Sequence, residues 1–283
     1  MWARILTAAV LIPLVLALVW WGPAILLAAI AAGVAILALL EFFHLAGRMG
    51  LRAFRDWTLA CTAGIFYAQY TAGLVETHSF RGVSIVRQAG WGISLEAVLL
   101  VFIFGMAVIG IGTRRPLYEV LPGMAASAAG LLFVALPFSY LVRIDEIEPS
   151  GRMLVLFTLF LMWAGDTLAY IVGKTLGQVP MAPELSPQKT WEGAFANLIG
   201  SLLVGFLFAR WLQVDTIPLL LIAACGNIAG QTGDLIESAY KRGAAAKDSG
   251  SLLPGHGGVL DRIDSLILAS PVVWAAWRWF AAH

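Results

Sequence analysis

Hydrophobic residues run along this chain in long stretches that short polar or Gly/Pro-rich segments interrupt. A helix needs about 20 predominantly apolar residues to cross the hydrocarbon core of a bilayer. The pattern therefore predicts about nine transmembrane helices, at approximately residues 5–21, 24–41, 57–75, 93–112, 123–142, 152–173, 193–212, 217–237 and 259–280. The first run follows Arg4 as a signal peptide would, but a second run follows it at once, so we interpret it as a retained helix.

The composition agrees with a membrane protein. The chain of 283 residues is 60% hydrophobic and 12% charged, whereas soluble domains carry about 25% charged residues. Cys61 and Cys225 both lie inside apolar runs, which excludes a disulfide framework and a cysteine-based zinc site. The net charge of +1 gives no indication of a nucleic-acid partner. We expect an all-α polytopic membrane protein.

Basic residues are unevenly distributed between the predicted loops. With the N-terminus inside and the spans alternating, 12 of the 18 Lys and Arg residues fall on inner segments. Because cytoplasmic loops carry an excess of Lys and Arg, both polar segments described below are predicted to face the cytoplasm. Any chemistry there would take place at the cytoplasmic face of the membrane.

Ionisable residues within the predicted spans are concentrated in the second half of the chain. We therefore predict that residues 1–150 form N-terminal transmembrane helices that act as scaffold or lipid-facing wall. Residues 151–283 are predicted to form the catalytic half of a single integral membrane unit. Polar residues at span ends in the first half, such as Glu41 and His44, are interpreted as solvated boundary positions.

Three carboxylates flank the last two predicted spans. Asp261 and Asp264 are three residues apart, so on a helix both project from one face. Asp234 lies near the inner end of the preceding span, behind glycines that permit close helix packing. Like charges at a membrane boundary repel one another and are costly to desolvate, so a shared Mg²⁺ ion is one explanation. Salt bridges to Arg242 and Arg262 are the alternative.

The helix that carries Asp234 continues as a polar face. Glu237 or Ser238, and then Lys241, follow at spacings that place them on the same face as Asp234. Lys241 and Arg242 taken alone would be explained by the preference of basic residues for helix C-termini.

A glycine-rich turn, Pro-Gly-His-Gly-Gly at residues 254–258, leads into the helix of Asp261. Glycines permit close backbone approach and the free N–H groups of a helix start favour an anion, so the predicted ligand is phosphate. His256 either orients or protonates a phosphate or hydrogen-bonds within the loop. We favour a positioning role because phosphoryl transfer between ionised groups needs no general base.

A second polar segment lies earlier in the chain. Asp166 is a carboxylate within a predicted span and hence a functional candidate, with Lys174 or Lys189 as its predicted partner. Ser186 before Pro187 has the pattern of a helix N-cap. Lys189 would then lie in a first helical turn, where the helix dipole disfavours a cation unless an anion is bound. We therefore expect Lys189 to contact phosphate.

These two segments resemble the signature of the phosphatidate cytidylyltransferases, also called CDP-diacylglycerol synthases. The longer block runs from Ser238 to Arg242, through Lys247-Asp248, to residues 253–264, with Tyr240 at a position that is usually aliphatic or Phe in the family. The other block runs from Trp163 to Gly193, with Gln188 at a position that is often basic. Together they span roughly residues 160–265.

The resemblance implies that CTP and phosphatidic acid react to give CDP-diacylglycerol and pyrophosphate. It also implies Mg²⁺ as cofactor, as one ion or two, a homodimer, and a site at the cytoplasmic face of the cell (inner) membrane. Phosphatidic acid would reach the site from the bilayer, between apolar helices.

The residues and the resemblance together give the following candidates. The catalytic residues are Asp234, Lys241, Arg242, Lys247, His256, Asp261 and Asp264, and the metal ligands are Asp234, Asp261 and Asp264. The substrate-binding residues are Ser186, Lys189, Thr190, Ser238, Gly255, Gly257, Gly258 and Arg262. Asp166, Glu237 and Asp248 are candidates of second rank.

Two other functions share some of these features. A CTP-dependent polyprenol or phytol kinase would use similar carboxylates and glycines, but it would transfer the γ-phosphoryl group and release CDP. An ion-coupled transporter would explain Asp166 and Asp234 within spans. The polar residues cluster at one predicted membrane face, whereas a transporter needs a pathway to both faces.

Overall fold

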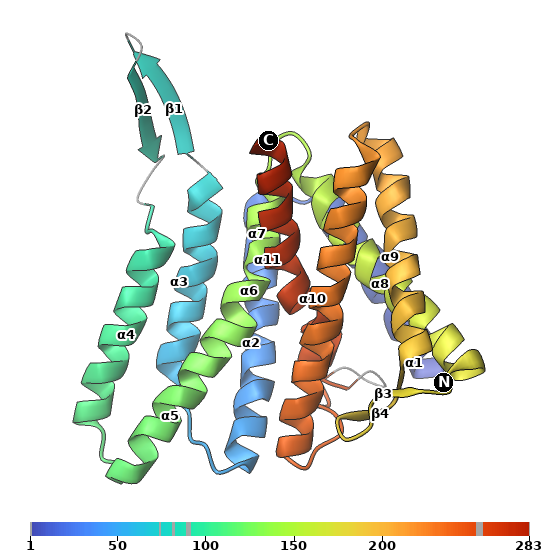
Figure 1. The fold of residues 1–283 in the computed structure, drawn as a ribbon. Coiled ribbons are helices and arrows are strands. Elements are labelled where there is room, and N and C mark those ends of the chain that lie inside the picture. The colour runs from blue at the N-terminus through green and yellow to red at the C-terminus, as the bar shows by residue number, and fades with distance from the viewer. Residues whose placement is uncertain (1, 74, 81–82, 89–91, 253–256, 283) are drawn as a thin grey trace.

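The computed structural model is a bundle of long helices with a small β-hairpin at each end (Figure 1). It describes residues 2–73, 75–80, 83–88, 92–252 and 257–282. The helices are α1 (Trp2–Trp21), α2 (Ala24–Arg48), α3 (Arg55–Gly73), α4 (Leu95–Gly112), α5 (Leu117–Gly130), the π-helical turn η1 (Leu131–Ala135), α6 (Leu136–Phe138), α7 (Tyr140–Asp145), α8 (Gly151–Leu176), α9 (Trp191–Leu212), α10 (Thr216–Gly243) and α11 (Leu260–Ala282). The strands are β1 (Val75–Phe80), β2 (Val83–Gln88), β3 (Pro180–Ala182) and β4 (Ser186–Thr190).

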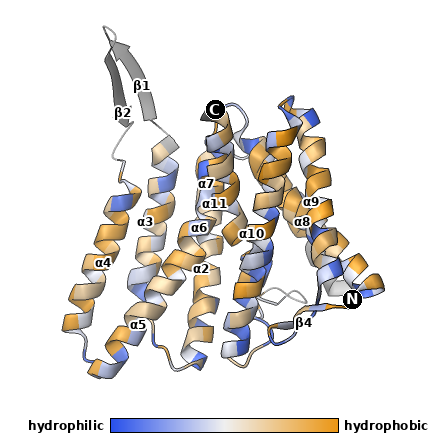
Figure 2. Cartoon of the chain, viewed as in Figure 1, coloured by the Kyte–Doolittle hydropathy of each residue, from blue (hydrophilic) through white to orange (hydrophobic). Residues whose placement is uncertain are grey.

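Six helical stretches within the described residues are long and apolar enough to cross a membrane. They are Ala24–Arg48, Leu95–Gly112, Leu117–Asp145, Gly151–Leu176, Trp191–Leu212 and Thr216–Gly243. Figure 2 shows that hydrophobic residues cover most of the helical surface. The expected class, an all-α polytopic membrane protein, is confirmed. The total of nine crossings stays a prediction, because α1, α3 and α11 coincide with predicted spans without meeting the same criterion.

Two helices extend beyond their predicted spans into the region that holds the polar residues. α10 continues to Gly243, so Asp234, Ser238 and Lys241 share one continuous helix, as expected. α2 continues to Arg48 and therefore includes Glu41. The carboxylate of Glu41 accepts hydrogen bonds from the start of α11, so its interpretation as a solvated boundary residue is wrong.

The predicted N-cap at Ser186 is also wrong. Residues 186–190 form β4, which pairs antiparallel with β3, and α9 begins only at Trp191. Thr190 is the N-cap, since its hydroxyl accepts a hydrogen bond from the N–H of Gly193 at 3.2 Å. The hairpin pairing extends the backbone through Ser186 and Pro187, and a hydroxyl next to the helix then takes over the capping. Lys189 consequently lies on a strand beside the bundle.

The hairpin of β1 and β2 lies at the opposite end of the bundle from β3 and β4 (Figure 1). Its strands pair antiparallel, from Val75 opposite Gln88 to Phe80 opposite Val83. The sequence pattern predicted no element for this segment, which falls between two predicted spans.

Glycines allow α10 to pack closely against α11, as the sequence predicted. A Cβ atom on Gly226 would lie 2.9 Å from a methyl group of Val273, and one on Gly230 would lie 3.3 Å from the carbonyl oxygen of Ser265. A Cβ atom on Gly233 would lie 2.5 Å from the carbonyl oxygen of Asp264. Small residues at such a contact let two backbones approach each other, and here they bring the acidic residues of both helices together.

We predict that Gly233→Ala lowers the stability of the folded protein by about 1–3 kcal/mol, because the added methyl group would overpack the contact of α10 with α11. Gly33→Ala on α2 is the matched control, since a Cβ atom there meets nothing within 4 Å. That variant should be neutral or more stable by about 0.5–1 kcal/mol, the usual gain of Ala over Gly inside a helix. Thermal unfolding in detergent measures both, and equal midpoints would contradict the tight contact.

Candidate functional site

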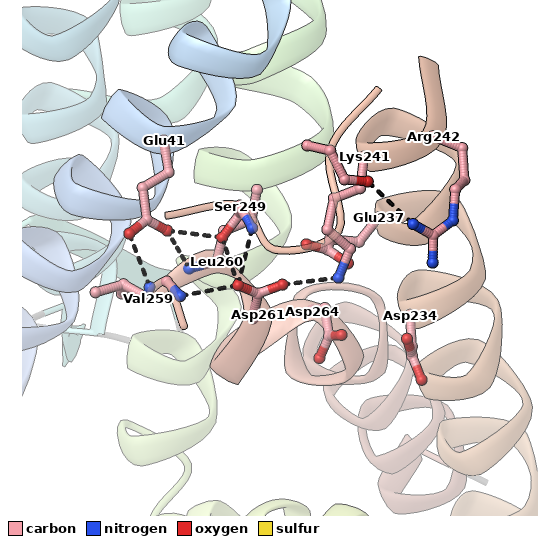
Figure 3. A network of polar contacts seen from close by, with 12 residues as sticks. Glu41, Asp234, Glu237, Lys241, Arg242, Ser249, Val259, Leu260, Asp261 and Asp264 are labelled. Carbon is pink, nitrogen blue, oxygen red and sulfur yellow. Dashed lines mark hydrogen bonds and ion pairs between the residues drawn. The ribbon is translucent and has the colours of Figure 1, made fainter. Parts of the chain in front are cut away.

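The polar residues of the C-terminal half meet at one end of the bundle. The end of α10, the start of α11 and the β3–β4 hairpin lie together there, and the close-up in Figure 3 shows the charged side chains of α10 and α11. The site is therefore assembled from segments that the sequence separates by up to about a hundred residues. The charged groups thus lie beside long apolar helices.

Three carboxylates form the centre of the site. Asp234 and Glu237 are one helical turn apart on α10, and Asp264 is in the first turns of α11. One oxygen atom of each lies within 4.8 Å of the others. Carboxylate oxygens are the ligands that Mg²⁺ prefers, and Mg²⁺ usually takes few protein ligands and keeps other positions for water or phosphate. The donor set fits that ion.

Two lysines partly neutralise this acidic centre. Lys189 Nζ lies 2.6 Å from Asp234 Oδ2. Lys241 forms ion pairs with Glu237 and, at 2.7 Å, with Asp261 Oδ1. These pairings leave Asp264 without an ion pair among the described residues, so the carboxylates of the site outnumber the lysines that pair with them.

Glu237 is deeply buried within this cluster. Its side chain is 3% exposed, and neither of its oxygen atoms accepts a hydrogen bond, although Lys241 pairs with it. A buried carboxylate without hydrogen bonds is costly unless a cation compensates it. Glu237, a candidate of second rank from the sequence, therefore lies at the centre of the cluster.

Asp261 lies at the edge of this cluster, where Lys241 joins it to Glu237. Its Oδ2 atom accepts hydrogen bonds from Ser249 N at 3.0 Å, Ser249 Oγ at 2.9 Å and Gly258 N at 2.8 Å, while Oδ1 pairs with Lys241. Gly257 has a positive φ of 79°, and a Cβ atom there would lie 3.0 Å from Asp261 Oδ2. Asp261 thus holds Gly258 and Ser249 against the start of α11, and the metal role predicted for it stays a prediction.

A cavity of about 330 Å³ opens beside the acidic centre, between α8, α9, α10 and β4. This volume is at the lower end of the range of small-molecule sites. Its polar lining includes five of the site residues predicted from the sequence, namely Asp166, Ser186, Lys189, Thr190 and Asp234. Lys189 and Asp234 therefore link the cavity to the carboxylate cluster.

A chain of side-chain amides lines the same cavity. Gln231 donates to Asn227 Oδ1 at 2.6 Å, and Asn227 donates to Asn197 Oδ1 at 2.5 Å and to Ser201 Oγ at 2.6 Å. Asn197 in turn donates to Asp166 Oδ1 at 3.1 Å. Both N–H groups of Asn227 are used, so its orientation is fixed.

This network corrects the predicted partner of Asp166, which is Asn197 and not a lysine. Lys189 pairs with Asp234, and Lys174 Nζ lies 3.5 Å from the hydroxyl of Tyr170 on its own helix. Sequence reasoning missed Asn197 and Asn227, although an amide within an apolar span was a usable signal, because such groups need partners inside the bundle.

The remaining predicted residues lie around this centre. Arg242 donates to the carbonyl oxygens of Leu185 and Ala246, both at 3.0 Å, and so joins the β3–β4 hairpin to the segment after α10. Ser238 is buried on α10, and Gly258 donates to Asp261. Exposed positions at the edge of the site are occupied by Lys247, Asp248 and Arg262. Gly255 and His256 lie outside the described residues.

Comparison with known proteins finds a match over almost the whole chain. A family model described as "Cytidylyltransferase family" matches residues 2–280. A protein of Brucella abortus named phosphatidate cytidylyltransferase is 34% identical over 284 residues, which cover 96% of this chain and 91% of the relative.

Other relatives with the same name match a shorter part. The protein of Rickettsia prowazekii is 33% identical over 64% of this chain and 82% of its own length. The protein of Bacillus subtilis is 38% identical over 50% of this chain, and the match spans about half of that relative, 54% of its length.

We predict that Asp264→Asn and Glu237→Gln each weaken Mn²⁺ binding by at least about tenfold, the lower limit of what changes around a metal ion cost. Asp261→Asn should weaken it less, because its oxygen atoms are engaged by Lys241, Ser249 and Gly258. Mn²⁺ titration followed by electron paramagnetic resonance measures this in detergent.

The matched control is Asp248→Asn, which removes an exposed carboxylate from the edge of the site. A loss in Asp261→Asn as large as in Asp264→Asn, with Glu237→Gln unaffected, would instead support the ligand set Asp234, Asp261 and Asp264 expected from the sequence.

Proposed function

The chain belongs to the cytidylyltransferase family, and from this premise we propose that it is a phosphatidate cytidylyltransferase that converts CTP and phosphatidate into CDP-diacylglycerol and pyrophosphate. The observation that carries the proposal is the cluster of Asp234, Glu237 and Asp264 between apolar helices. A site for a triphosphate and a lipid phosphate needs strong compensation of charge at the edge of a membrane, and this cluster with its lysines is suited to provide it.

In this reaction an oxygen atom of the phosphatidate phosphate attacks the α-phosphorus of CTP. A new phosphorus–oxygen bond forms, the bond from the α-phosphorus to the bridging oxygen of the β-phosphate breaks, and pyrophosphate leaves with that electron pair. Both reacting groups are already ionised, so the protein's contribution is positioning and electrostatic stabilisation.

Asp234, Glu237 and Asp264 would hold Mg²⁺, as their grouping and their oxygen donors suggest. When bound, the ion offsets the charge on the phosphate oxygens and lowers the repulsion between the two anionic substrates. Lys241 keeps Glu237 and Asp261 in place on the two helices that carry them. A second ion, with Asp261 as a ligand, remains part of the proposal.

Lys189 would bind phosphate beside the metal centre. It extends from β4 to Asp234 and lines the cavity, and a phosphate oxygen could replace Asp234 as its partner once that carboxylate binds the metal. Ser186 and Thr190 line the same wall and add hydroxyl donors. Arg242, Lys247 and Arg262 lie at the exposed side, where the outer phosphates of CTP would leave as pyrophosphate.

The acyl chains of phosphatidate would reach this site sideways from the bilayer. The cavity adjoins α8 and α9, whose outward residues Tyr170, Ile199 and Leu203 are exposed and apolar or aromatic. We further propose that the site faces the cytoplasm of a bacterial inner membrane and that the enzyme is a homodimer. The excess of Lys and Arg on inner segments supports the orientation.

The test is an assay with purified protein, phosphatidate, Mg²⁺ and CTP labelled at the α-phosphate. We expect label in a lipid product together with unlabelled pyrophosphate. Lys189→Met should lower kcat/KM by about 10²-fold or more, the usual effect of removing one electrostatic donor. Lys174→Met is the matched control, because Lys174 is exposed and contacts Tyr170 instead of the cluster.

Two results would contradict the proposal. Transfer of label from the γ-phosphate of CTP to a polyprenol, with release of CDP, would indicate the kinase. Equal losses in Lys189→Met and Lys174→Met would show that Lys189 has no specific role in phosphate binding.

A further inference from the structure

Glu41 connects the N-terminal half of the chain to the start of α11. Its Oε1 atom accepts a hydrogen bond from Val259 N at 3.0 Å, and its Oε2 atom accepts hydrogen bonds from Leu260 N at 2.8 Å and Ser249 Oγ at 3.0 Å (Figure 3). Glu41 is about two hundred residues away from these donors in the sequence. A single side chain of α2 thus holds both α11 and the segment that precedes it.

The first N–H groups of a helix have no partners within the helix and form its positive end. Val259 and Leu260 are buried, at 7% and 1% exposure, so water cannot replace a missing acceptor easily. The negative charge of Glu41 is therefore placed where it satisfies two buried donors and the helix dipole at once. It fixes the position of the first turn of α11.

The same carboxylate is joined to Asp261 through Ser249. The hydroxyl of Ser249 lies 3.0 Å from Glu41 Oε2 and 2.9 Å from Asp261 Oδ2, and its backbone N–H donates to Asp261. A hydroxyl has one proton, so it donates to one of the two carboxylates at a time. Asp261 then pairs with Lys241, which also holds Glu237. Glu41 is thus joined to Glu237 of the acidic centre by four successive contacts, through Ser249, Asp261 and Lys241.

Two glycines, Gly250 and Gly258, pack closely against the carboxylate of Glu41. A Cβ atom on Gly250 or Gly258 would overlap the carboxylate oxygens of Glu41. Neighbouring residues of α2 support the same region, since Phe42 packs edge-on against Tyr240 at 5.3 Å between ring centroids and Arg48 donates to the carbonyl oxygen of Ala245 at 2.9 Å. The end of α2 therefore holds the segment between α10 and α11 at several points.

We propose that Glu41 is a positioning residue for cytidylyl transfer, which holds the first turn of α11 and Ser249 so that Asp261 and Lys241 keep their places beside the metal centre. This inference rests on the proposed function. It also gives the N-terminal half, which the sequence suggested to be scaffold or lipid-facing wall, a direct part in the geometry of the site.

The test compares Glu41→Gln with the unmodified protein. Glutamine keeps the size of the side chain but replaces one acceptor oxygen by an N–H₂ group, which would face a donor. We expect kcat to fall by about 10- to 100-fold, as for other residues that orient a metal site, with KM for CTP nearly unchanged. The double variant Glu41→Gln/Ser249→Ala should lose less than the product of the two single effects, because both residues act through one network.

Amide hydrogen exchange gives a measurement that needs no activity. In Glu41→Gln, exchange should become faster in residues 257–264 and stay unchanged in α4, which lies away from this contact. Asp56→Asn is the matched control, since it removes an exposed carboxylate at the start of α3, near the end of α2. That variant should change neither kcat nor exchange.

The possible outcomes separate the two proposals. The inference is wrong if Glu41→Gln behaves like Asp56→Asn, or if exchange becomes faster throughout the bundle, which would show a general structural role. If the unmodified protein forms no CDP-diacylglycerol, the proposed function fails, whereas faster exchange confined to residues 257–264 would still support the positioning role of Glu41.

Discussion

The repulsion between carboxylates at the contact of α10 with α11 is the constraint on which the rest of the site depends. Asp234, Glu237, Asp261 and Asp264 would separate if nothing compensated their charge next to hydrocarbon. Lys241 binds one carboxylate from each helix, and Lys189 extends from a different segment to Asp234. The glycines of α10 then permit the close approach that the charges oppose. Such an arrangement suits the proposed binding of a cation and anionic substrates at this place.

Much of this arrangement could be predicted from the sequence because its causes are local. The helices follow from runs of apolar residues, and the common face of Asp234 and Lys241 follows from helical spacing. The expectation that Lys189 contacts phosphate rested on a position in a first helical turn, whereas Lys189 lies on β4, and the contact itself stays a prediction. The hairpin pairing of residues 180–190 depends on contacts between two short segments, and it replaced the N-cap that Ser186 and Pro187 suggested.

Other features depend on contacts across long separations, which a single sequence does not show. Glu41 has the pattern of an ordinary residue near the end of a span, and only packing reveals that it faces buried N–H groups of α11. To predict the hydrogen-bonded chain of Asn197, Asn227 and Gln231, one must know how α9 and α10 pack against each other. Spacing also suggested that Asp261 and Asp264 would act together, whereas Asp264 groups with Asp234 and Glu237, and the oxygen atoms of Asp261 are engaged by Lys241, Ser249 and Gly258.

The fit between Glu41 and the two glycines opposite it has a consequence for how such a sequence can change over time. A larger residue at position 250 or 258 would be harmful while glutamate is present at position 41, and it could be tolerated only after that side chain, and for position 258 also the side chain of Ser249, had become smaller. A smaller residue at position 41, in turn, would first leave Val259 and Leu260 without an acceptor. Every single step between the two arrangements is therefore unfavourable, so these three positions are expected to vary together or not at all.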